Sequence, residues 1–207
     1  MKENLIQIVK AILSGILVGI GGILYVSSSS QIVASVLFSF ALILILERGY
    51  NLFTGKVGYL LPYKKGHFKL LMQTLLGNMV GILFAAGLFL LSGKDGAITH
   101  AAEIFDYKLT QMWYETLVLA IFCGFMMYLA VDSYHKFKNP GASLLVVIFA
   151  VSIFIVAGFE HSITDMSYLV LSKTFTLEAF LFILIVLTGN MIGAVILNLL
   201  NHYIKSA

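Results

Sequence analysis

The sequence predicts an all-α integral membrane protein whose chain crosses the bilayer six times. Of its 207 residues, 60% are hydrophobic and only 11% are charged, whereas soluble domains are typically about 45–50% apolar and about 25% charged. The apolar residues form long continuous runs and do not alternate with polar residues as they do in the strands of an outer-membrane barrel. We therefore expect a single transmembrane domain over residues 1–207.

Six apolar segments each come close to the ~20 residues that a helix needs to cross the hydrocarbon. They cover about residues 5–26, 31–53, 69–92, 112–132, 141–159 and 178–201. The first is too long for a removable signal peptide and lacks a small-residue cleavage site, so we expect it to be the first span. The longest connections, around 54–68 and 93–111, are too short for a soluble domain.

The basic residues predict the orientation of these segments. With the N-terminus inside, ten Lys and Arg residues fall on the cytoplasmic side, and Lys94, Lys108 and Lys173 fall on the other. This excess places both termini in the cytoplasm. Because the basic residues flank membrane segments, the net charge of +3 does not indicate a nucleic-acid partner.

Two similar motifs indicate an internal repeat. The third segment contains GNMVG (Gly77–Gly81) and the sixth contains GNMIG (Gly189–Gly193). Each motif falls on the last helix of a three-helix half, and halves with an odd number of spans face opposite ways across the membrane. We therefore predict inverted repeats over about residues 1–92 and 112–201. A small-residue packing face is the alternative explanation of the motif.

The middle helix of each half, helix 2 and helix 5 of the six, is predicted to be interrupted near the membrane interior. The stretch NLFTGKVGYLLP contains Gly55, Gly58 and Pro62, and the stretch VAGFEHS places an acid and an imidazole directly after Gly158 and Phe159. An ionised residue at the bilayer centre costs roughly 2.5–3.5 kcal/mol on insertion scales. Irregular backbone at that depth is tolerated only where it lines a cavity or is buried in protein.

The two interruptions are therefore expected to meet at a polar centre. Thr54 from the first half should approach His161 from the second. Asn78 and Asn190 are natural partners for the freed carbonyl groups and for Glu160, because an unpartnered amide in hydrocarbon is costly. Gly158 supports the broken backbone.

At these residues the chain resembles the formate–nitrite transporter family. Members carry an LFT loop in the second helix and a G-F/Y-E-H-S break in the fifth, which here are Leu52–Thr54 and Gly158–Ser162. Phe38 and Phe154 match the positions of the family's two aromatic constrictions. Leu42 shares a helix face with Phe38.

The resemblance also implies that Lys108 is the lysine of the outer vestibule. Two positions depart from the family pattern: Gly124 stands where members usually have Asn, and Asn51 stands where many have an acid. The resemblance further implies a homopentamer with one pore per protomer in a prokaryotic inner or plasma membrane. The family carries formate, nitrite and hydrosulfide, and some members carry lactate, so the anion stays open.

The residues predict a transport mechanism and no cofactor or metal. Three apolar side chains exclude water and ions from the pathway: Phe38, Leu42 and Phe154. A charged anion meets a large desolvation penalty there, whereas its neutral acid does not. Lys108 would concentrate a small monovalent anion, and a proton would then neutralise it. The proton comes either from His161, whose unperturbed pKa is about 6.5, or from water.

Three other classes of protein remain as alternatives. His161 with Asp165 at i,i+4 and the adjacent Ser162 could form an intramembrane enzyme, but the sequence has no Gly-x-Ser-x-Gly motif and no metal-ligand spacing. A structural or sensor membrane subunit leaves the paired breaks unexplained. A cation channel lacks a ring of carboxylates. We expect a proton-linked anion channel or transporter that is not an enzyme.

Overall fold

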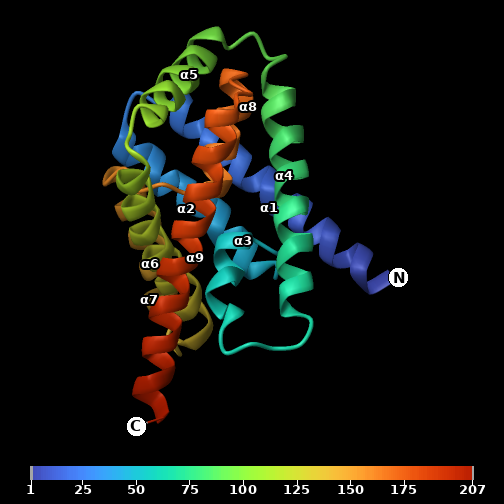
Figure 1. Cartoon of the computed structure of the whole chain (residues 1–207), viewed down its shortest axis with the longest axis vertical. Helices are drawn as coiled ribbons and strands as arrows, with labels where there is room; N and C mark the ends of the chain where they lie inside the picture. The colour runs from blue at the N-terminus through green and yellow to red at the C-terminus, as the bar shows by residue number, and fades with distance from the viewer. Residues whose placement is uncertain (1, 207) are drawn as a thin grey trace.

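The computed structural model describes residues 2–206, and these residues form helices and no strand (Figure 1). Four helices are long and apolar enough to cross a membrane: α1 (Lys2–Ser27), α4 (His67–Phe89), α6 (Trp113–Lys136) and α9 (Leu177–Ser206). Two further apolar helices, α2 (Gln31–Glu47) and α7 (Pro140–Val156), have 17 residues each. The prediction of an all-helical membrane protein is confirmed.

Helices α2 and α7 end in the same way. Gly49 follows the first with a φ of 59° and Gly158 follows the second with a φ of 69°, in the left-handed region that favours glycine. In both cases the backbone N–H of the next residue donates to the carbonyl oxygen five residues earlier, at 2.9 Å. This arrangement caps the last carbonyl groups of a helix and turns the chain away from its axis.

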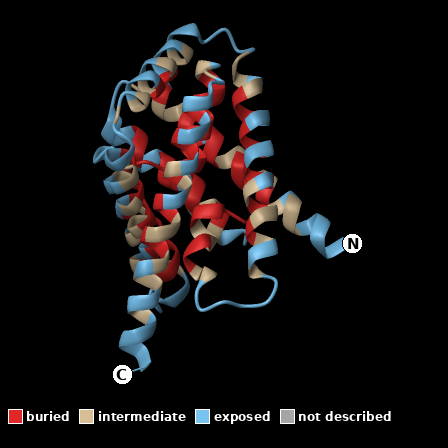
Figure 2. Cartoon of the chain, in the orientation of Figure 1, coloured by how far each residue is buried: buried red, intermediate tan, exposed pale blue. Residues whose placement is uncertain are grey.

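After each break the chain continues in short helices inside the molecule. The first break leads into α3 (Phe53–Lys56) and a 3₁₀ helix, η1 (Val57–Leu60), and the second leads into α8 (Ser162–Ser172). Every residue of α8 from Ser162 to Leu171 is buried. Figure 2 shows that the buried residues follow the middle of the molecule, with exposed residues around the outside.

The predicted position of the first break is wrong. Gly55 and Gly58 lie within α3 and η1, Pro62 follows them, and the chain breaks earlier, around Gly49. The apolar segment expected to reach residue 53 therefore ends as a helix at Glu47. Gly58 has another role, because a Cβ there would lie 3.1 Å from the Cβ of Ala194 on α9.

The predicted connection at 93–111 contains a helix, α5 (Asp95–Leu109). This helix lies across the end of the molecule opposite the C-terminus (Figure 1). Ala101 and Phe105 are fully buried, and the Lys108 side chain is only 13% exposed. The connection thus places a lysine inside the protein, on a segment where the resemblance implies a lysine of the outer vestibule.

Small residues let the long helices pack in two close pairs, α1 with α4 and α6 with α9. A Cβ at Gly77 would lie 2.5 Å from the Cβ of Ala11, and a Cβ at Gly189 would lie 2.5 Å from the Cβ of Ala120. The packing face that was the alternative explanation of the GNMxG motifs is therefore present. Gly124, one of the two departures from the family pattern, packs against the Asn190 backbone.

Candidate functional site

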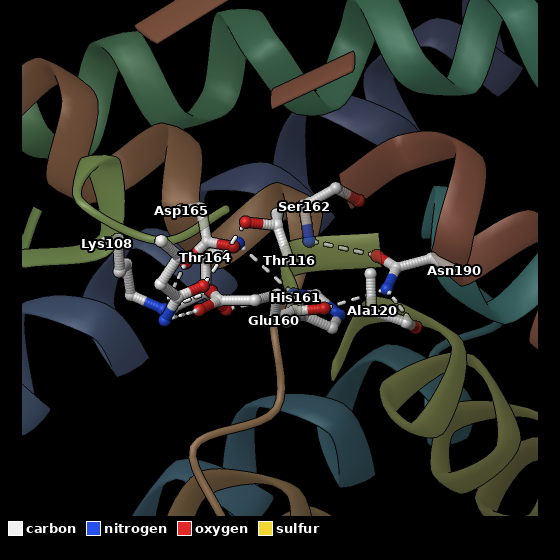
Figure 3. Close-up of polar contacts among 10 residues, drawn as sticks. Lys108, Thr116, Ala120, Glu160, His161, Ser162, Thr164, Asp165 and Asn190 are labelled. Atoms are coloured by element: carbon white, nitrogen blue, oxygen red, sulfur yellow. Dashed lines mark hydrogen bonds and ion pairs between the residues drawn. The ribbon is translucent and has the colours of Figure 1, made fainter. Parts of the chain in front are cut away.

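A buried asparagine on α9 holds the second break in place. The Asn190 side chain accepts a hydrogen bond from the backbone N–H of Ser162 through Oδ1, at 3.0 Å. Its Nδ2 donates to the carbonyl oxygen of Glu160 at 2.8 Å and to that of Ala120 on α6 at 2.9 Å (Figure 3). The bonds to Ser162 and Glu160 satisfy backbone groups that the break would otherwise leave without partners in the interior, and the bond to Ala120 ties the asparagine to α6.

The equivalent asparagine on α4 makes the same bonds to the first break. Asn78 Oδ1 accepts from the backbone N–H of Phe53 at 2.9 Å. Its Nδ2 donates to the carbonyl oxygen of Asn51 at 2.9 Å and to that of Ala11 on α1 at 2.7 Å. Both asparagines are fully buried, as the cost of an unpartnered amide requires.

The two breaks meet where a hydroxyl faces an imidazole. Thr54 Oγ1 lies 3.0 Å from His161 Nε2, and both residues are buried. His161 also caps the N-terminus of α8, because its Nδ1 accepts the backbone N–H of Thr164 at 3.2 Å. In the neutral imidazole an accepting Nδ1 leaves the proton on Nε2, which then donates to Thr54.

Aromatic side chains close the space beside this pair. The rings of Phe38 and Phe154 meet edge to face, with centroids 6.3 Å apart. The Phe154 ring also stacks on the His161 imidazole, with centroids 5.4 Å apart and planes 16° from parallel. Together with Leu42, these are buried residues of α2 and α7, so apolar surface surrounds the polar pair.

Two cavities approach the constriction from the α5 end of the molecule. The smaller, of about 70 Å³, is lined by Phe38, Phe154, His161 and Asp165, among others. The larger, of about 380 Å³, shares several lining residues with it, including Lys108. Lys108 therefore lines both cavities, whereas His161 lines only the smaller one.

A third cavity, of about 360 Å³, lies on the other side of the constriction. Leu42 and Leu52 line it, together with the basic residues Lys56 and Lys64. It shares no lining residue with the small cavity beside His161. The interior is thus divided into two chambers.

Lys108 reaches from α5 to two carboxylates. It forms ion pairs with Glu160 and with Asp165, whose Oδ1 lies 3.3 Å from the ammonium nitrogen (Figure 3). Gln111 adds a bond from its Nε2 to Glu160 Oε1 at 3.3 Å. Burial alone would lower the pKa of Lys108. The carboxylates of Asp165 and Glu160 raise this pKa by more than burial lowers it, so the net shift is upward and the lysine stays charged.

Sequence reasoning missed two members of this cluster. Asp165 was considered only as a partner of His161 in an enzyme, but its carboxylate pairs with Lys108, and His161 Nδ1 bonds to Thr164 instead. Gln111 gave no signal, because it lies on a connection far from the break in sequence. Within residues 2–206, His, Cys, Asp and Glu side chains form no group of three that could hold a metal ion.

The fold and this site define a class of protein. Apolar helices long enough to cross a membrane enclose cavities on both sides of one buried polar pair. Polar groups buried at membrane depth typically mark a substrate pathway. The molecule is a membrane transport protein.

Comparison with known proteins identifies the family. The sequence model described as "Formate/nitrite transporter" matches residues 2–204. The chain is 30% identical over 244 residues to the "Formate-nitrite transporter" of Plasmodium falciparum, covering 98% of this chain and 78% of that protein. The "Formate channel FocA" of Escherichia coli K12 is 25% identical over 177 residues, covering 75% and 62%. The chain belongs to the formate/nitrite transporter family, as the LFT and GFEHS stretches predicted.

Solved structures show the same fold. A "Pentameric formate channel with formate bound" superposes with a TM-score of 0.85 at 19% identity, over 99% of this chain and 98% of that one. An "FNT family ion channel" superposes with a TM-score of 0.84 at 26% identity, over 97% and 90%. The helix breaks and the closely packed helix pairs therefore belong to an architecture that this family shares.

Proposed function

We propose that the protein is a channel or transporter for the small monovalent anions of weak acids, with formate or nitrite as the first candidates. Hydrosulfide and lactate are the alternative substrates. The observation that carries the proposal is the buried pair of Thr54 and His161, flanked by Phe38, Phe154 and Leu42, between cavities from opposite ends. The names of the relatives, formate–nitrite transporter and formate channel, support these anions.

The constriction favours a neutral form of the substrate. A bare anion would lose its water among the rings of Phe38 and Phe154 without a compensating charge, whereas the neutral acid has far less hydration free energy to lose. The hydrogen bond from Thr164 N–H to His161 Nδ1 supports an uncharged imidazole, because protonation of Nδ1 would replace this acceptor with a donor. His161 then offers the Nε2–H as a hydrogen-bond donor, shared with Thr54.

The proposed arrangement in the membrane has six crossings. Four are the long helices, and two are α2 and α7 completed by the short helices after their breaks. The residues bonded by Asn78 and by Asn190 recur 109 positions apart, which supports inverted repeats over about residues 1–92 and 112–201 within one transmembrane domain. Both termini would be cytoplasmic.

The same protein would assemble and act in a cell membrane. A homopentamer follows from the likeness to a pentameric channel, and a prokaryotic inner or plasma membrane is the proposed location. Protons would move with the anion. Flux should therefore rise as the pH falls, because the neutral acid becomes a larger fraction of the substrate.

Stopped-flow flux into proteoliposomes tests this function. Formate, nitrite, hydrosulfide and lactate would be compared from acidic to neutral pH for the wild type and His161→Asn, with His202→Asn, an exposed histidine on α9, as the matched control. We expect one anion to pass fastest, with proton uptake that the His161 variant loses and the control keeps. Equal leakage of all four without an effect at His161 would overturn the role of the imidazole.

The same preparation separates the alternative classes. A structural or sensor subunit would give no anion flux above that of empty liposomes. An intramembrane enzyme would convert one of the substrates to another compound, which analysis of the vesicle contents would detect.

A further inference from the structure

The charges beside the small cavity do not balance if every group is ionised. One ammonium group, Lys108, faces two carboxylates, Glu160 and Asp165, each only 1% exposed. Three ionised groups would leave a net negative charge at the cavity that an incoming anion must enter. Such a charge would repel the anion and would lack water to stabilise it.

The two carboxylates differ in how well they are bonded. Glu160 has a partner at each oxygen, Lys108 at Oε2 and Gln111 at Oε1. Within the described part of the chain, Asp165 has Lys108 at Oδ1 only, and its buried Oδ2 has no hydrogen-bond partner. An ionised oxygen without a donor is costly in the interior, and a proton on Oδ2 removes that cost.

Among residues 2–206, no second cation lies beside Asp165 to stabilise its charge. Titratable and charged groups approach it from the break and from three other helices as well as from α8: Lys108 (α5), Glu160 and His161 (break), Tyr25 (α1), Cys123 (α6) and Tyr168 (α8). Lys108 is the one cation in this set when the imidazole is neutral. The proton that balances the cluster therefore belongs on one of the two carboxylates, and Asp165 is the less well bonded.

We propose that Asp165 is a further proton-exchange site of the transport pathway, holding a proton on Oδ2 and passing it to the anion in the cavity shared with His161. This inference rests on the proposed function and names the group that supplies the proton. The Oδ2–H bond breaks as the bond between that proton and the anion forms, so the substrate becomes neutral beside the constriction. Asp165 is then reprotonated by an H+ from the outer solution that arrives through the outer cavity, so one H+ is consumed for each anion that passes.

The charge of the cluster changes at each step. With Asp165 protonated, Lys108 and Glu160 cancel and an anion can approach. After the transfer the cluster carries one negative charge, which repels a second anion until Asp165 is protonated again. Anion entry and proton entry are thereby linked by the same three side chains.

Asp165→Asn tests the exchange with a side chain of the same shape that cannot transfer a proton. We expect formate flux to fall by about 10²-fold, the lower end for a positioned proton donor, with a flattened pH profile. Asp106→Asn, which changes an exposed aspartate on α5, is the matched control and should keep the wild-type formate flux and pH profile. An ionised, purely structural Asp165 predicts the opposite sign, because Asn would remove a repelling charge and raise the flux. Unchanged or increased flux would overturn the proposal.

Infrared spectroscopy supplies a measurement that does not depend on transport. We expect the wild type at neutral pH to show the C=O stretch of a protonated carboxyl group, shifted in D₂O, and the band to be absent in Asp165→Asn. Should that variant not fold, isotopic labelling of the aspartate carboxyl carbons in the wild type must shift the band, whereas labelling of the glutamate carboxyl carbons must leave it unchanged. A band that shifts only with labelled glutamate, or no band in the wild type, would contradict the assignment.

The two proposals fail in different ways. If the wild type carries no anion, the proposed function is wrong even where the infrared band is present. If the wild type carries an anion with protons and Asp165→Asn behaves identically, only the role of Asp165 is wrong.

Discussion

The two helix breaks share one backbone construction and carry different chemistry. Each follows a glycine with positive φ, Gly49 or Gly158, and each is bonded by a buried asparagine, Asn78 or Asn190. The atoms bonded and their order along the chain are the same in both. The construction therefore solves one physical problem twice, which is how to satisfy the backbone groups freed inside a membrane.

The side chains at the equivalent positions separate the two breaks. The first presents Asn51 and Leu52 where the second presents Glu160 and His161. Asn51 donates to the Gln7 side chain at 2.7 Å and remains neutral, whereas Glu160 pairs with a buried lysine. The comparison teaches that the two breaks share a structural support in their backbone. The charged carboxylate of Glu160 and the imidazole of His161 belong to the second break.

The largest effect is expected where the helix pairs touch. Gly81→Val and Gly193→Val each place a Cβ under 3.0 Å from a backbone carbonyl oxygen of the partner helix. Ordinary overpacking costs roughly 1–3 kcal/mol, and a clash with the backbone of a packed helix should exceed that range and the losses predicted for the other variants. Gly87→Val, with nothing within 4 Å of its Cβ, is the control. Folded yield and thermal unfolding in detergent measure the difference, and a normal yield for either variant would show that the pairs can separate.

Removal of Lys108 should affect only the second break. Lys108→Met leaves the buried carboxylate of Glu160 without its cation, and breaking a buried pair in this way costs about 3–5 kcal/mol. The raised pKa of Lys108 means that the wild-type pair persists at neutral pH and is lost only in alkali. The variant's deficit should shrink at acidic pH, where the uncompensated negative charge is neutralised.

Thermal unfolding across pH measures this effect. Lys94→Met, an exposed lysine at the start of α5, should unfold like the wild type at every pH. A deficit in Lys108→Met that stays constant down to acidic pH would argue against an uncompensated charge as its cause.

The asparagines should contribute equally to stability. Asn78→Ala and Asn190→Ala each remove three hydrogen bonds and leave two buried backbone groups of a break unpaired, one N–H and one C=O, because the third acceptor lies within α1 or α6 and keeps its helical partner. At about 1–3 kcal/mol for each unsatisfied group, each variant should lose at least about 2 kcal/mol. Thr188→Ala, an exposed residue of α9, should change stability by less than about 0.5 kcal/mol. Unequal losses in denaturant titrations would show that the two breaks are not equivalent in energy.

The smallest effect is expected at the glycines that end α2 and α7. Gly49→Ala and Gly158→Ala meet no atom within 4 Å, so only the left-handed backbone opposes them, at roughly 1–2 kcal/mol each. Gly96→Ala in α5 has the same free space without a positive φ and should be neutral or stabilising. Unfolding midpoints would measure the loss of stability in Gly49→Ala and Gly158→Ala. A variant more stable than the wild type would show that the left-handed backbone does not oppose the substitution.

Much of the site follows from residue types and local spacing. The buried acid and imidazole after Gly158, the hydroxyl of Thr54 and the two GNMxG motifs can all be recognised in a single sequence, because each is a polar or glycine signal within an apolar run. The first break was misplaced for the same reason. Gly49, Gly55 and Gly58 stand close together, and local rules do not choose among them.

The sequence by itself determined the class of protein, its helical segments and the polar residue types at its centre, since hydropathy and helix-breaking residues act locally. Only the tertiary structure decided which glycine ends α2, that α5 carries Lys108 into the interior, and that Asp165 pairs with that lysine. The physical reason is that a broken helix in a membrane takes its hydrogen-bond and ion-pair partners from other helices. Those partners lie far away along the chain.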